Sequence, residues 1–168
     1  MALGYVYRQG LIHRDVKPAN ILATVRKVSP QGHRDAVSAP PGANKQTWGG
    51  PASASELVTD IKLSDFGSVM NLQSERTQVF RVGSLAYMPP EQLDGDALDC
   101  RADIYALAGV LYHLIAGRAP FDATQQAALM HQIYHAEPAS LQLLRDGVPP
   151  RLDRLIARAM SKRREDRH

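Results

Sequence analysis

The chain has 168 residues, enough for one domain with its own apolar core, and 44% hydrophobic and 22% charged residues are typical of a globular protein. The formal net charge of +3 suits an anionic ligand such as a nucleotide, but it is too small to indicate a nucleic-acid partner. The single cysteine, Cys100, excludes an internal disulfide, and neither a secretory signal nor a bilayer-spanning apolar run is visible. We therefore expect a cytoplasmic protein without a membrane segment.

Residues 1–67 show a short helical pattern at the start and two apolar runs. Leu3, Val6 and Tyr7 lie at helical spacing, which predicts that the chain opens within a helix. The runs NILATV and LVTDIKLSDFG have strand character, and we expect them to pair as a small β-hairpin. Between them, residues from about 26 to 56 are dense in Pro, Gly, Ser and Ala and follow neither period. This composition predicts a long surface insert.

The second half of the chain is predicted to be helical. Residues 103–116 are apolar on nearly every face, which indicates a buried central helix. Residues 123–135 are amphipathic, and the segment from Pro149 to Met160 begins with two prolines suited to a first helical turn. On one face that last segment carries Leu152, Leu155, Ile156, Ala159 and Met160.

The stretch GLIHRDVKPANIL, residues 10–22, gathers the groups that phosphoryl transfer to a hydroxyl needs. The carboxylate of Asp15 can orient the hydroxyl and accept its proton, and Lys17 can reach the transferring phosphate from the same side of an extended loop. The amide oxygen of Asn20 is a ligand that a hard cation accepts. Chance occurrence of this cluster is improbable because three further motifs follow it.

Those three motifs come in a fixed order along the chain. Asp65-Phe66-Gly67 follows the strand-like IKLS, where Asp65 could bind a magnesium ion that bridges phosphates. The next motif is GSLAYMPPEQL, residues 83–93. The last is DIYALAGVLYHLIAGRAPF, residues 103–121.

Taken together, the motifs resemble the catalytic half of the eukaryotic-type serine/threonine protein kinases. HRDVKPAN resembles the family's catalytic loop, DFG its magnesium loop, and MPPE its Ala-Pro-Glu motif with Pro89 in place of alanine. The lysine two residues after Asp15 is the serine/threonine type, since tyrosine kinases resemble HRDLAARN there. The resemblance implies an α+β, protein-kinase-like fold, with a mainly helical C-terminal lobe and a small β-hairpin. It also implies transfer of the γ-phosphate of ATP to Ser or Thr hydroxyls of a protein substrate.

The resemblance assigns roles to individual residues. Asp15 and Lys17 are the expected catalytic pair, Lys17 also contacts the phosphates of ATP, and Asn20 and Asp65 are expected to hold Mg²⁺. Ser84 stands where the family has a threonine whose hydroxyl touches the catalytic Asp and Lys.

The resemblance also implies regulatory and structural positions. Arg14 marks kinases that are activated by phosphorylation of the activation loop, and Thr77 is favoured over Ser74 as the acceptor. Glu91 and Arg167 are expected to form a buried ion pair, and Asp103, which opens the central-helix motif, is expected to be structural. The remaining alternative is a non-catalytic, pseudokinase-like interaction module, whose partner binding would not depend on Asp15.

One part of the family pattern has no counterpart in these 168 residues. The sequence contains no G-x-G-x-x-G, and only twelve residues precede His13. In the family the Gly-rich loop, a strand lysine and its partner glutamate come before the catalytic loop. We therefore interpret residues 1–168 as a partial kinase domain, the C-terminal lobe, which lacks its N-terminal lobe and is inactive alone.

Overall fold

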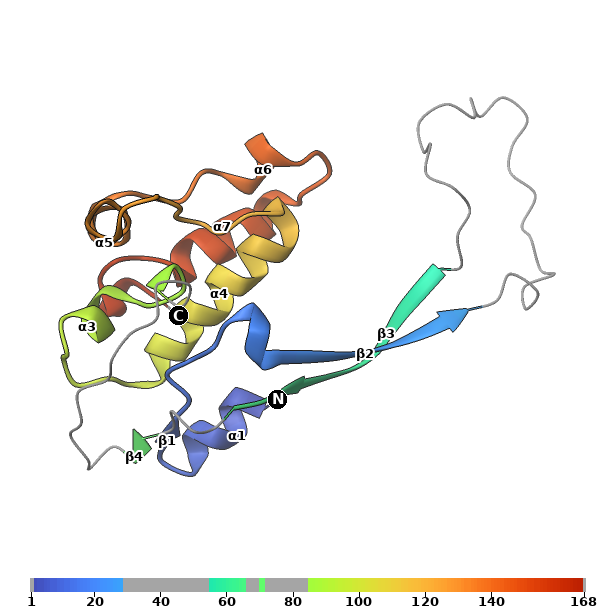
Figure 1. The fold of residues 1–168 in the computed structure, drawn as a ribbon, viewed down its shortest axis with the longest axis horizontal. Coiled ribbons are helices and arrows are strands. Elements are labelled where there is room, and N and C mark those ends of the chain that lie inside the picture. The colour runs from blue at the N-terminus through green and yellow to red at the C-terminus, as the bar shows by residue number, and fades with distance from the viewer. Residues whose placement is uncertain (1, 29–54, 66–69, 72–84, 168) are drawn as a thin grey trace. The chain divides into compact units, whose positions relative to one another are not determined.

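The computed structural model describes residues 2–28, 55–65, 70–71 and 85–167. The chain divides into two compact units, one made of residues 1–21 and 63–168 and the other of residues 22–62. The first unit is mainly helical, and the second consists of two paired strands where it is described (Figure 1). Thr77 and Ser84, which the sequence nominates, lie outside the described residues, as does most of the expected insert.

The expected β-hairpin is present. Strand β2 (Ile21–Val28) pairs with β3 (Ser55–Leu63), and the two strands run in opposite directions (Figure 1). Both strands extend a few residues into the range 26–56 that was expected to be insert. Pairing explains the difference, because backbone hydrogen bonds to a neighbouring strand extend a strand through polar residues that have no apolar alternation.

The helical unit contains six α-helices among the described residues. They are α1 (Ala2–Arg8), α3 (Pro90–Leu93), α4 (Cys100–Ala116), α5 (Gln126–His135), α6 (Leu141–Leu144) and α7 (Pro150–Ala159). The described residues also include two 3₁₀ turns, η1 (Pro18–Asn20) and η4 (Arg164–Asp166). A second, unexpected sheet pairs β1 (Leu11–Ile12) with β4 (Met70–Asn71) antiparallel. Strands of two residues are too short for sequence periodicity to reveal.

Helix α4 is the centre of the helical unit. Asp99 caps its N-terminus by accepting a 2.8 Å hydrogen bond from the Arg101 amide, and Gly117 (φ 74°) ends it in the left-handed conformation that glycine adopts without strain. On one side α4 packs with α5, α6 and α7 around a cluster that includes Tyr105, Tyr112 and Ile133. A smaller cluster lies against Ala106 and Val110, and it contains Val16 and Tyr87.

Two expectations about helix faces are wrong in part. Helix α4 is not buried all round, because Leu114 is 65% exposed and Leu111 lies at the surface. On α7 and at the residue that follows it, Ile156, Ala159 and Met160 are buried as expected, but Leu155 is half exposed. Apolar side chains outnumber the positions that face a core, and folded proteins commonly leave some of them in water.

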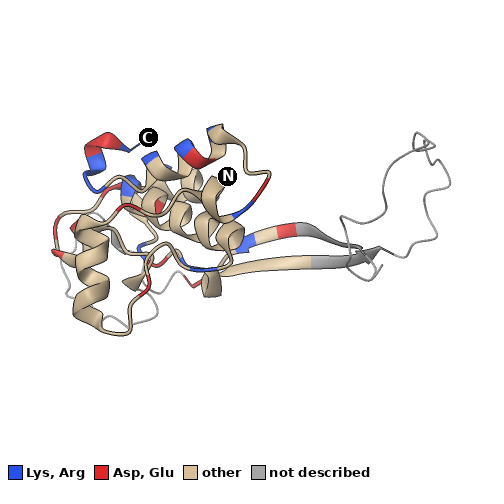
Figure 2. Cartoon of the chain, turned by 90° about the horizontal axis from the view of Figure 1, so that it is seen from above, with Lys and Arg blue, Asp and Glu red and all other residues tan. Residues whose placement is uncertain are grey.

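Charged residues are spread over the helical unit. Among the described residues, acidic and basic positions are interspersed along the helices and their connections (Figure 2). The described helices include none that has both the length and the apolar content to cross a bilayer.

Candidate functional site

Two hydrogen bonds anchor the loop between β1 and η1 to the first turn of α4. The backbone amide of His13 donates to Oδ2 of Asp103 (2.8 Å), and the amide of Arg14 donates to Oδ1 of the same carboxylate (2.9 Å). His13 is fully buried and Asp103 is 5% exposed. One carboxylate therefore fixes two consecutive peptide groups directly before Asp15.

The same loop has a strained backbone. Arg14 has φ of 68°, a left-handed conformation that costs a non-glycine residue about 1–3 kcal/mol. Its amide is held by Asp103, and its carbonyl accepts a 2.8 Å hydrogen bond from Nε2 of Gln92 on α3. Asp65 has a similar φ of 62°. Backbone strain of this kind clusters at functional sites.

Asp15, Lys17 and Asn20 meet at one carboxylate oxygen. Nζ of Lys17 lies 2.6 Å from Oδ2 of Asp15, and Nδ2 of Asn20 donates to that oxygen at 3.1 Å. Nδ2 also donates to the Asp15 carbonyl at 2.8 Å. The Asp15 and Lys17 side chains are 16% and 22% exposed, so the pair is largely buried yet still reachable from solvent. The carboxylate is thus oriented by two donors.

Ser64 places the neighbouring Asp65 near Asp15, Lys17 and Asn20. The amide of Ser64 (2.8 Å) and its hydroxyl (3.1 Å) both donate to the carbonyl of Asn20, and the Ser64 carbonyl lies 3.1 Å from Nε2 of His13. Asp65 itself is exposed. Two carboxylates and an amide from segments 45 residues apart (65 minus 20) are therefore brought to one region.

Burial shifts the pKa values of the two groups that hold the loop. Desolvation raises the pKa of the Asp103 carboxyl, and the amides of His13 and Arg14 oppose this shift. Desolvation lowers the pKa of the Arg14 guanidinium, and the nearby Asp103 charge opposes it. Nε and Nη1 of Arg14 are buried without a hydrogen-bond partner. Buried guanidinium donors without a partner can form hydrogen bonds with an anionic group from another segment or from a ligand.

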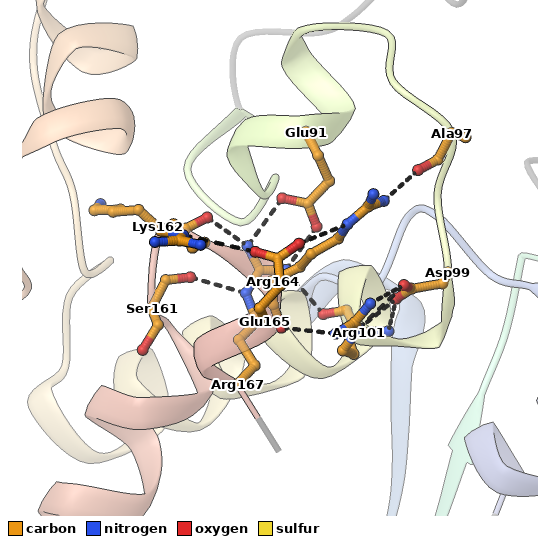
Figure 3. Close-up of polar contacts among 10 residues, drawn as sticks. Glu91, Ala97, Asp99, Arg101, Ser161, Lys162, Arg164, Glu165 and Arg167 are labelled. Carbon is orange, nitrogen blue, oxygen red and sulfur yellow. Dashed lines mark hydrogen bonds and ion pairs between the residues drawn. The ribbon is translucent and has the colours of Figure 1, made fainter.

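A buried ion pair joins α3 to the end of the chain. Arg167 donates from Nη1 to Oε1 of Glu91 (2.6 Å) and from Nη2 to Oε2 (2.9 Å), the bidentate geometry that arginine favours (Figure 3). The Arg167 side chain is fully buried and that of Glu91 is 10% exposed. The expected Glu91–Arg167 contact is therefore present.

A second network lies next to this pair. Nε and Nη2 of Arg101 contact the carboxylate of Asp99, and Nη1 of Arg101 donates to the carbonyl of Arg164 at 3.2 Å. Arg164 in turn donates to the Ala97 carbonyl at 2.8 Å (Figure 3). The hydrogen bond from Arg101 lowers the pKa of Asp99. The ion pair thus ties Arg167 to α3, and the second network ties η4 to the N-terminal end of α4.

Several contributors to the site were not anticipated from the sequence. Gln92 and Ser64 act through hydrogen bonds that no spacing rule reveals. Tyr87 was also missed, although it packs in the cluster of Val16 and its hydroxyl lies 2.6 Å from Nδ1 of His113. The available signal was position, because Gln92 and Tyr87 both lie within the motif of residues 83–93.

Comparison with known proteins identifies the family. The family model "Protein kinase domain" matches residues 1–168. The chain belongs to the protein kinase domain family. Serine/threonine-protein kinase PknL of Mycobacterium tuberculosis is 32% identical over 169 residues, and serine/threonine-protein kinase PknB of the same organism is 26% identical over 171. PknB of Mycobacterium leprae is 27% identical over 171 residues. The predicted resemblance to serine/threonine kinases is confirmed.

These alignments cover 99% of this chain in each case but only part of each relative. The chain spans 34% of the length of PknL and 22% of the length of either PknB. The kinase domain family accounts for the α+β character of the structure and for the motif order that the sequence showed.

Proposed function

We propose that this chain is the catalytic-loop half of a serine/threonine protein kinase and takes part in transfer of the γ-phosphate of ATP to Ser or Thr hydroxyls of proteins. The observation that carries the proposal is the convergence of Lys17 Nζ and Asn20 Nδ2 on Oδ2 of Asp15, at 2.6 and 3.1 Å. The names of the serine/threonine-protein kinases PknL and PknB support the same activity.

In this proposal each group of the loop has a separate task. Asp15 orients the substrate hydroxyl and accepts its proton, because its carboxylate is fixed but remains partly accessible. Lys17 supplies positive charge to the transferring phosphate, and until substrate arrives that charge is balanced by Asp15. Asp103 and Gln92 act as positioning residues, since they hold the backbone on either side of the strained Arg14.

The residues present fit a magnesium ion. The nitrogen of the Asn20 amide is used by Asp15, which leaves the carbonyl oxygen as its metal-binding atom, and Asp65 offers an exposed carboxylate next to Ser64. Carboxylate and amide oxygens are the ligands that Mg²⁺ accepts, usually together with water and phosphates. Bound there, Mg²⁺ would supply charge neutralisation to the phosphates of ATP.

We further propose that residues 1–168 correspond to the C-terminal lobe and that catalysis requires an N-terminal lobe as partner. No G-x-G-x-x-G occurs in the sequence. In this proposal, residues outside these 168 supply the Gly-rich loop that covers the phosphates of ATP and the lysine that binds them. The other proposed partner is a protein substrate, and the proposed setting is the cytoplasm, where ATP is available.

Arg14 supports a regulatory extension of this proposal. Two of its buried nitrogens have no partner, and a phosphate on the activation segment would supply the missing acceptors. Thr77 is the proposed acceptor of that phosphate. In an active two-lobe protein, Thr77→Ala and Arg14→Ala should each lower activity, and the double variant should be no worse than either single variant.

The catalytic assignment is tested by separating chemistry from metal binding. The chain is fused behind the N-terminal lobe of PknL, and phosphate transfer to a Ser/Thr protein substrate is measured over a range of Mg²⁺ concentrations. Asp15→Asn should abolish turnover at every Mg²⁺ concentration, whereas Asn20→Ala should shift the Mg²⁺ dependence upward. A fused protein that binds ATP but transfers no phosphate would favour the non-catalytic interaction module instead.

A further inference from the structure

Helix α5 carries two histidines on its outer face. His131 and His135 are four residues apart, so they lie on the same side of the helix one turn from each other. Both side chains are exposed, whereas Leu129 and Ile133, on the opposite face, are 4% and 0% exposed. The histidines therefore do not contribute to the core that holds α5 in place.

The two imidazole rings approach each other closely. Their centroids are 4.8 Å apart and their planes are inclined by 53°. Two imidazole nitrogens bound at about 2.0–2.1 Å to one tetrahedral metal ion would place the ring centroids about 5 Å apart. The observed separation is therefore close to that of two imidazoles that share one metal ion.

The nitrogens of this pair are available for a ligand. Of the histidines that the structure describes, His13 lies against the Ser64 carbonyl and His113 against the Tyr87 hydroxyl. Within the residues that the structure describes, the ring of His131 contacts that of His135, the ring of His135 also contacts that of Tyr134, and neither histidine has a side-chain hydrogen bond. A neutral imidazole with an unused ring nitrogen is a common ligand for transition metals.

The electrostatic setting at the end of α5 is mixed. His135 is the last residue of the helix, and the C-terminal end of a helix dipole favours a cation. Lys162 already supplies one cation there, with Nζ 2.6 Å from the Ile133 carbonyl and 4.2 Å from the centroid of the Phe121 ring. Lys162 is half-buried beside the buried Phe121 and Ile133, so the exposed face with the two histidines stays open.

We propose that His131 and His135 form a two-histidine site for one borderline-soft divalent cation, of the class of Zn²⁺, Cu²⁺ and Ni²⁺. Within the described part of the chain no group of three or more His, Cys, Asp or Glu side chains could hold a metal, so water completes the coordination. Such a site differs in position and ligand type from the oxygen ligands proposed for Mg²⁺ at Asn20 and Asp65. Its existence does not depend on kinase activity.

The test is calorimetric titration of the 168-residue chain with ZnCl₂ and with CuCl₂ in a non-chelating buffer. We expect one ion per chain, Cu²⁺ bound more tightly than Zn²⁺, and no competition from a large excess of Mg²⁺. His131→Ala and His135→Ala should each weaken binding about tenfold or more, since loss of even an outer partner of a metal ligand costs about 10- to 100-fold.

Two matched variants separate a built site from general affinity for metals. His131→Ala combined with Ala128→His keeps two histidines at exposed positions of α5 but sets them seven residues and about 10 Å apart, which should abolish chelation. Cys100→Ser removes the single thiol and should leave binding unchanged. A parent chain that binds Zn²⁺ and Cu²⁺ no better than the spacing variant would overturn the proposal.

Discussion

Arg167 has all five of its N–H donors satisfied within the fold. Two reach Glu91, and the others reach the carbonyls of Ser161, Arg101 and Lys162. The guanidinium also lies 4.8 Å from the ring centroid of Tyr105. Every donor is paired and the side chain is buried. Removing the carboxylate partner would therefore destabilise the fold by more than the loss of one hydrogen bond, because it would leave a buried charge without its counter-charge.

Glu91→Ala should therefore destabilise the chain by about 3–5 kcal/mol, because it leaves the buried Arg167 without its counter-charge. Urea unfolding followed by circular dichroism measures the change. Glu165→Ala is the matched control, since the exposed Glu165 contacts arginines of the same segment and its loss should leave stability nearly unchanged. Equal stabilities of the Glu91 variant and the parent would show that the pair contributes little.

Two buried tyrosines provide a second comparison at this scale. The hydroxyl of Tyr105 is buried without a partner, whereas the hydroxyl of Tyr112 donates to the Ala139 carbonyl at 3.0 Å. An unsatisfied buried hydroxyl costs about 1–3 kcal/mol, and a made hydrogen bond contributes about 0.5–1.5 kcal/mol. Tyr105→Phe should thus raise the free energy of unfolding and Tyr112→Phe should lower it. Changes of the same sign in both variants would contradict this reading.

At the scale of elements, α5 is held at its C-terminus by Lys162. Nζ of Lys162 contacts the carbonyls of Gln132 and Ile133, and burial lowers its pKa to about 8. The unfolded chain keeps the ordinary value of about 10.4, so between pH 8 and 10 it binds a proton that the folded chain has released. The contribution of Lys162 to stability should therefore rise with pH across this window.

This sign is tested with Lys162→Met. The free energy of unfolding of the parent minus that of the variant should increase between pH 7.5 and pH 9.5. Lys62→Met, at an exposed position of β3, serves as the control and should give a difference that does not change with pH. A difference that falls with pH for Lys162→Met would mean that the ring of Phe121 and the two carbonyls outweigh desolvation.

The connection between β2 and β3 is also testable as an element. The composition of residues 29–54 offers few apolar side chains to bury, and the cost of closing a loop depends only weakly on its length. Replacing 29–54 by a short Gly/Ser turn should leave the melting temperature nearly unchanged. A large drop, measured by differential scanning fluorimetry, would show that this segment packs on the rest of the protein.

Local sequence patterns predicted the longer helices and strands. Helical spacing located α4, α5 and α7, and apolar runs located β2 and β3. The sequence did not predict the pairing of β1 with β4, because two-residue strands carry no period. It also overestimated the burial of Leu114 and Leu155, because periodicity shows which face is apolar but not whether another element covers that face.

The sequence motifs predicted the residues of the candidate site that lie within those motifs. Asp15, Lys17 and Asn20 were nominated by their spacing, and the structure brings them to one carboxylate oxygen. Their functional roles stay predictions. The contact from Gln92 to the Arg14 carbonyl joins residues 78 apart, and such pairings depend on the fold rather than on local sequence.

At the scale of the whole molecule, the helical unit acts as a frame for one strained loop. Asp103 on α4 and Gln92 on α3 hold Arg14 in its left-handed conformation. Glu91, next to Gln92, is in turn fixed by Arg167 at the far end of the chain. Destabilising the Glu91–Arg167 pair should for this reason affect the loop that carries Asp15 as well as overall stability.

We propose above that this chain supplies the catalytic loop and depends on an N-terminal lobe to bind and position ATP. The most direct measurement is incorporation of labelled γ-phosphate into a Ser/Thr protein substrate by the 168-residue chain alone and by the same chain fused behind the N-terminal lobe of PknL. We expect no transfer by the chain alone, and transfer by the fusion that Asp15→Asn abolishes. Turnover by the chain alone that is lost in Asp15→Asn would contradict the claim.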